Sequence, residues 1–178
     1  MIDVYKNKKL HAEKYFITDL SKRIDALLKD KKVSKIEANL VQNYSPCNGY
    51  PGYSGCVDDI LEFKEGMERK GVSFSLKIKF ANFYKCYYKQ GNDSWKKSQN
   101  IDGLVKLLQN DVRLQLLEGE KGWEDFLNDE MFMDVSEKNK THLLEIATSK
   151  ERIKREKVDK EILKYIKIKA LGKPKTTK

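Results

Sequence analysis

The chain has 178 residues, of which 39% are hydrophobic and 35% charged, a composition typical of one globular domain with a charged surface. No apolar run approaches the ~20 residues of a membrane span, and the start, "MIDVYKNKKL", shows no signal-peptide pattern, so we expect a cytoplasmic or nuclear protein with no membrane partner. The net charge of +9 points instead to a polyanionic partner.

Hydrophobic periodicity predicts the elements in the first half of the chain. Apolar residues at helical spacing predict a helix over residues 11–29, and the segment "SKIEANLVQNY" predicts an alternating strand over 34–44. A second helix is expected to start at Cys56. The clearest strand is "GVSFSLKIKFANFY", residues 71–84, in which apolar residues alternate with Ser and Lys.

The second half begins with a polar and aromatic stretch, residues 85–100, which we expect to be a long loop. The remaining elements are predicted as a helix over 101–110, a strand over 112–118, and helices over 122–132, 141–147 and 150–171. This alternation of helices and strands favours an α/β fold with parallel strand pairings.

Most of the positive charge lies at the C-terminal end. Residues 150–178 contain twelve Lys or Arg and four Asp or Glu, a net charge of +8, which leaves +1 for the remainder. We therefore expect a folded domain over 1–149 and a basic helix and tail over 150–178. Such a tail suits a nucleic acid, which releases counterions when it is bound. A solvated helix with a frayed end is the alternative.

The segment "SPCNGYPGYSGC" places Cys47 and Cys56 on either side of a Gly- and Tyr-rich stretch. The two thiols could form a disulfide, bind a metal, or share a surface loop by chance. An odd total of three cysteines and no visible secretory signal argue against the disulfide. With His11 they would supply three ligands and leave an open position, as in a catalytic zinc site. Glu13 could then transfer protons.

An H-x-E motif at a helix start, followed by "YSPC" and a second cysteine that opens a helix, resembles the zinc-dependent polynucleotide cytidine deaminases of the AID/APOBEC family. The likeness covers about residues 10–135. It implies a cytidine deaminase-like three-layer α/β/α fold with a central mixed sheet of up to five strands. The implied activity is the conversion of cytosine to uracil in single-stranded DNA or RNA, with Zn²⁺ as cofactor.

The resemblance also implies roles for individual residues. His11, Cys47 and Cys56 fall on the zinc-ligand positions, and Glu13 falls on the proton shuttle. Tyr84 falls on the aromatic residue that packs against the target base.

The resemblance implies that three further positions contact the base. Tyr44 takes the place of an aromatic residue that lines the pocket, and the backbone at Ala12 and Ser45 would hydrogen-bond to the pyrimidine edge.

The loop after the longest strand has a composition suited to single-stranded nucleic acid. Tyr87, Tyr88 and Trp95 alternate with lysines, so bases could stack on the rings while lysines meet phosphates. An ordinary exposed loop is the alternative. Cys86, in the same loop, is expected to be a plain thiol.

The sequence departs from the family in two places. Eight residues separate the cysteines, whereas the family usually has roughly two to four, so Cys47 is either looped back to the metal or displaced from a dead site. Only ten residues precede His11, whereas the family has a helix and a β-hairpin there. Two other functions therefore stay open: a deaminase of free cytidine or deoxycytidine, and a catalytically dead single-strand-binding module.

Overall fold

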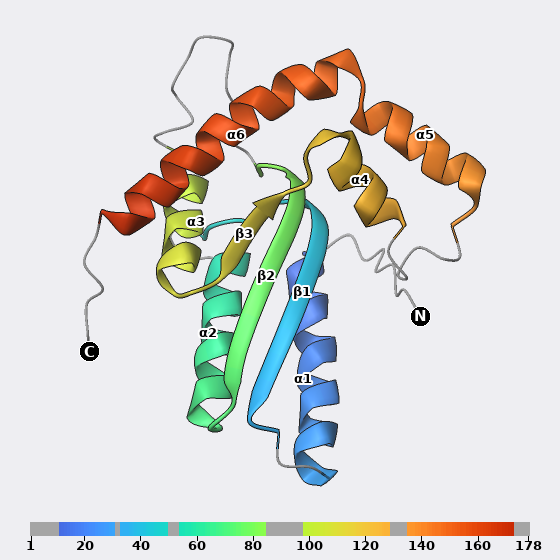
Figure 1. Cartoon of the computed structure of the whole chain (residues 1–178). Coiled ribbons are helices and arrows are strands. Elements are labelled where there is room, and N and C mark those ends of the chain that lie inside the picture. Colours follow the sequence, from blue (N-terminus) through green and yellow to red (C-terminus); the bar gives the residue numbers. More distant parts are fainter. Residues whose placement is uncertain (1–10, 31–32, 50–53, 85–97, 129–134, 173–178) are drawn as a thin grey trace.

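The computed structural model describes residues 11–30, 33–49, 54–84, 98–128 and 135–172 (Figure 1). The helices and strands in these ranges follow in the order predicted from the sequence. They are α1 (Ala12–Asp30), β1 (Lys35–Tyr44), α2 (Cys56–Arg69), β2 (Ser73–Asn82), α3 (Gln99–Gln109), β3 (Arg113–Leu116), α4 (Gly119–Leu127), α5 (Glu137–Ala147) and α6 (Lys150–Leu171). Among the described helices, none has the length and apolar character needed to cross a bilayer.

The described strands form a three-stranded parallel sheet in the order β1-β2-β3. Leu40 lies opposite Ile78 and Phe80 lies opposite Leu116. Helix α2 connects β1 to β2, and α3 connects β2 to β3. Parallel pairs need such crossover connections, whereas a tight hairpin can join only antiparallel strands. The α/β class is therefore confirmed, but the expected mixed sheet of up to five strands is wrong for the described residues.

The two crossover helices end in the same way. Gly71 after α2 and Asp111 after α3 adopt positive φ values of 75° and 60°. The buried valine that follows each of them, Val72 or Val112, donates its amide to a carbonyl in the last turn of the helix. These junctions turn the chain directly into β2 and β3, which places both helices on one face of the sheet because such crossovers are right-handed.

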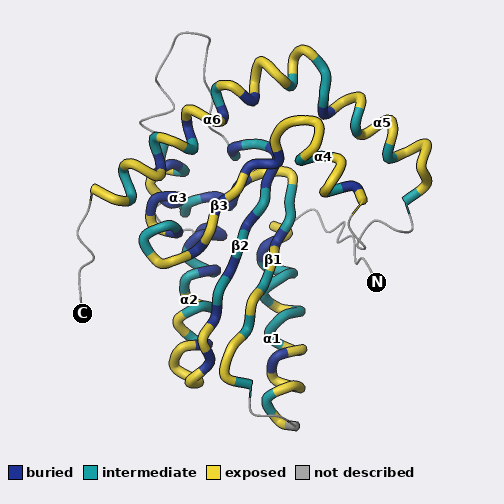
Figure 2. Tube along the Cα trace, viewed as in Figure 1, coloured by how far each residue is buried: buried dark blue, intermediate teal, exposed yellow. Residues whose placement is uncertain are grey.

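The hydrophobic core lies between this face of the sheet and helices α1, α2 and α3 (Figure 2). Ile78 and Phe80 of the central strand are fully buried. Helix α6 packs against α3 and adds Ile162 and Ile166, which are also fully buried, to the same core. Within the described part of the expected basic segment, the outer face of α6 is therefore the part left exposed, and residues 173–178 lie outside the described ranges. The third layer of the expected α/β/α fold stays a prediction.

A buried polar network joins the start of α6 to the carboxyl-terminal edge of the sheet. The guanidinium of Arg152 donates to the carbonyls of Ala81 at 2.6 Å and Leu117 at 3.3 Å, where β2 and β3 end. It also donates to the side chains of Asn82 and Asp159, each at 3.3 Å, and Asp159 is fully buried. Helix α6 therefore supports the edge at which the candidate site lies.

Candidate metal centre

The candidate ligands lie where β1 ends and helices α1 and α2 begin. Cys47 follows β1, and Cys56 is the first residue of α2. His11 immediately precedes α1, and Glu13 is in its first turn. Residues two apart within a regular helix diverge by about 200° around its axis. Because α1 begins at Ala12, His11 lies outside the helix and can face the same site as Glu13.

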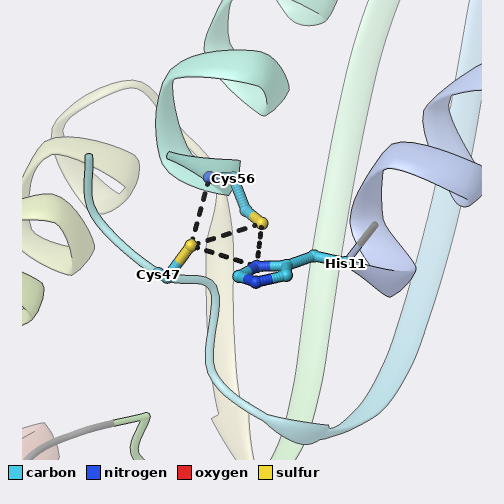
Figure 3. A group of neighbouring side chains, drawn as sticks. All are labelled: His11, Cys47 and Cys56. Atoms are coloured by element: carbon cyan, nitrogen blue, oxygen red, sulfur yellow. Dashed lines mark hydrogen bonds between the residues drawn. The ribbon is translucent and has the colours of Figure 1, made fainter. Parts of the chain in front are cut away.

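The three side chains point toward one another (Figure 3). The Nδ1 atom of His11 lies 3.1 Å from the Sγ atom of Cys56 and 3.2 Å from that of Cys47, and the two Sγ atoms are 3.5 Å apart. Tetrahedral zinc would hold such atoms about 3.6–3.8 Å apart. A shift of a few tenths of an ångström would therefore admit the ion. These residues could hold a metal ion, and one nitrogen with two sulfurs is a set that zinc favours.

The contact between the two thiols shifts their pKa values in opposite directions. The side chain of Cys56 lowers the pKa of Cys47 to about 6 through a hydrogen bond, against the opposing effect of burial, and the Cys56 backbone N–H adds to the lowering. The same contact with Cys47, together with burial, raises the pKa of Cys56. A metal ion would ionise both thiols, since thiolates are the ligands.

The long insertion between the cysteines closes back on itself at its two ends. The amide of Val57 donates to the carbonyl of Cys47 at 3.1 Å. A Cβ atom at Gly55 would lie 2.2 Å from the backbone nitrogen of Gly49, so only glycine allows this approach. The insertion therefore leaves Cys47 beside Cys56 instead of displacing it.

Asn100, in the first turn of α3, links the segment that follows Cys47 to the backbone of Tyr84. Its Oδ1 atom accepts a hydrogen bond from the amide of Asn48 at 2.8 Å, next to Cys47. Its Nδ2 atom donates to the carbonyl of Tyr84 at 3.0 Å. The role of Asn100 could not be predicted, because nothing in the sequence links an asparagine after a long loop to a cysteine more than fifty positions earlier.

A cavity of about 260 Å³ opens beside the ligands. Its lining residues are His11, Ala12, Glu13, Gln42, Asn43, Tyr44, Ser45, Cys47 and Tyr84. Seven of these nine were predicted as site residues, so the structure brings together positions that are far apart in the sequence. A larger cavity of about 510 Å³ lies along α6, but none of the predicted site residues lines it.

The aromatic side chains form one wall of the smaller cavity. The ring of Tyr84 lies edge-on to His11, with centroids 6.0 Å apart, and to Tyr44, with centroids 6.2 Å apart. The Oγ atom of Ser45 accepts from the amide of Tyr84, and its own amide donates to the carbonyl of Asn82 at 2.8 Å. The Ser45 N–H is therefore already paired within the protein, and hydrogen bonding of a base to the backbone of Ala12 or Ser45 stays a prediction.

Glu13 is 6% exposed and accepts a hydrogen bond from the Nε2 atom of Gln42 at 3.2 Å. Gln42 was not among the predicted site residues, although the alternation of β1 places it on the same face as buried Leu40. Four of the residues named in the sequence lie outside the described ranges: Tyr87, Tyr88 and Trp95, for which base stacking stays a prediction, and Cys86.

Among known proteins, no family model matches the chain and no curated sequence shows significant similarity to it.

Proposed function

We propose that this protein is a zinc-dependent deaminase that converts cytosine to uracil in single-stranded DNA or RNA. One observation supports the proposal: three side chains that could hold a metal ion adjoin a cavity that is also lined by the buried residue Glu13. The resemblance of the motifs around these residues to the AID/APOBEC family supplies the reaction and its substrate.

The side chains would divide the chemistry as follows. Zinc, held by His11, Cys47 and Cys56, would supply a water activated near neutral pH. Glu13 would take a proton from the attacking water and deliver it to the departing amino group, so that one water is consumed and one ammonia is released. Tyr84 would hold the target base flat against its ring. Tyr44, whose ring lies edge-on to Tyr84, would extend the aromatic wall beside the base.

The charge distribution favours a polynucleotide over a free nucleoside. Helix α6 contains nine Lys or Arg and four Asp or Glu, and Asp159 and Glu156 of these acids are buried. Lys157 and Lys164 lie on its exposed side. Lysines on one exposed helix face attract phosphates, which a free nucleoside lacks.

The test compares substrates on the same preparation. The purified protein is analysed for zinc by mass spectrometry and then incubated with a single-stranded DNA containing one cytosine, with the matching RNA, and with free cytidine. We expect deamination of an oligonucleotide, detected as the mass change from amino group to oxygen. The variant Glu13→Gln, which keeps the side-chain shape but cannot accept the proton, should retain zinc and lose the reaction.

Each other outcome points to a different function. Equal or faster turnover of free cytidine would contradict the polynucleotide substrate. Binding of oligonucleotides without any deamination by the zinc-loaded protein would identify a binding module and refute the enzymatic function.

A further inference from the structure

Gln42 occupies an unusual position at the end of β1. Ile36, Ala38 and Leu40 lie on one face of this strand, and Leu40 is buried in the core. The next residue on the same face is Gln42, because strand side chains alternate. An amide at the end of an otherwise apolar face is costly unless it is hydrogen-bonded. Its partners therefore indicate what it does.

The partner of this amide is Glu13. The Nε2 atom of Gln42 donates to Oε1 of Glu13 at 3.2 Å, and both residues line the cavity beside the metal ligands. The Oε1 atom of Gln42 is buried and has no hydrogen-bond partner among the described residues. Rotating the amide by half a turn would set this oxygen against the carboxylate, where two acceptors would repel each other. The N–H side of the amide is therefore held toward Glu13.

We propose that Gln42 is a positioning residue for the carboxylate of Glu13, an inference that rests on the proposed deaminase function. A proton-transferring carboxylate has two equivalent oxygens and several rotamers. A donor on Oε1 removes this freedom and leaves Oε2 as the oxygen available for the proton transfer. Small errors in such placement reduce rates strongly, because the reacting groups must be aligned before the chemical step.

The contact can be tested without any activity measurement. The side-chain amide signals of Gln42 are assigned in ¹⁵N-labelled protein by their disappearance in Gln42→Met. In the zinc-loaded protein, Glu13→Ala should shift these signals well beyond the spread seen for other side-chain amides. Gln109, whose Nε2 atom donates to the carbonyl of Ala170, is the internal control and should not move. Unshifted Gln42 signals would overturn the inference.

The functional consequence is tested by kinetics. Gln42→Met keeps the length of the side chain but removes the donor, so kcat should fall about 10- to 100-fold while KM stays within about twofold. Gln109→Met makes the same chemical change away from the cavity and should keep the wild-type rate. A raised KM at unchanged kcat, or a rate equal to that of Gln109→Met, would contradict the positioning role.

The two proposals fail separately. A zinc-loaded wild-type protein that deaminates no substrate would refute the proposed function. The positioning role in that reaction would then be lost as well, whereas the amide signals would still show whether Gln42 orients Glu13. Normal deamination with no loss of kcat in Gln42→Met would refute the role of Gln42 alone.

Discussion

Replacing Gly55 with alanine should disrupt the metal centre without touching a ligand. The backbone at Gly55 has φ −90° and ψ 168°, a conformation that alanine adopts freely, so the substitution introduces no backbone strain. The cost is steric. The new Cβ atom would lie 2.2 Å from the nitrogen of Gly49, 2.4 Å from the carbonyl carbon of Asn48 and 2.7 Å from the carbonyl oxygen of Cys47.

All three neighbours are backbone atoms that cannot rotate away. Cβ contacts below 3.0 Å essentially never occur, so the segment that contains Cys47 must retreat by about 0.8 Å. Metal sites tolerate errors of only about 0.2 Å in ligand distance. We therefore expect zinc affinity to fall by at least about 10- to 100-fold, as it does when the residues that support a metal ligand are changed. The overpacking should also lower the free energy of unfolding by about 1–3 kcal/mol.

Zinc affinity is measured by competition with a chromophoric chelator, and stability by thermal unfolding with and without zinc. The matched control is Gly66→Ala within α2, the helix that Gly55 precedes, where the new Cβ atom meets only Nη2 of Arg69 at 3.9 Å. This control should keep the wild-type affinity for zinc, and its free energy of unfolding should rise by about 0.5–1 kcal/mol, because alanine is the better helix former. Wild-type zinc affinity in Gly55→Ala would refute the close-approach argument.

Three further experiments test the ligands, the support of the sheet edge and the basic helix. Cys47→Ser should lose bound zinc in native mass spectrometry, whereas Cys86→Ser should keep it; a Cys47–Cys56 disulfide without metal in the wild type would contradict the zinc site. Arg152→Met breaks a buried ion pair and should lower the free energy of unfolding in urea by about 3–5 kcal/mol. Arg155→Met should lower it by less than about 1 kcal/mol, because the side chain of Arg155 is 43% exposed and lies 3.8 Å from Asp159. Equal losses would show that Arg152 does not support the edge. The double variant Lys157→Gln/Lys164→Gln should lower the slope of log affinity against log salt concentration for single-strand binding by about 1.4, measured by fluorescence anisotropy. The control double variant Lys22→Gln/Lys29→Gln on α1 should leave this slope unchanged. An equal reduction in both double variants would assign the effect to net charge alone.

The sequence by itself determined the elements and the ligand types. Alternation in β1 and β2 and helical spacing in α1 depend on local geometry, so periodicity was sufficient to place them. The candidate ligands could also be predicted, because His11 and Cys56 fall at predicted helix starts and Cys47 follows a predicted strand. Their chemical types then indicated a metal, and the structure brings all three together.

Only the tertiary structure decided what those elements touch. The charge pattern set residues 150–178 apart as a basic helix and tail, whereas the packing of α6 buries Ile162 and Ile166 fully in the core. The hydrogen bond between Gln42 and Glu13, and the close approach of Gly55 to the Cys47 segment, join residues from different elements. Periodicity shows which face of an element is apolar, but the partner of a polar side chain depends on how the elements pack, and that is fixed by the whole core at once.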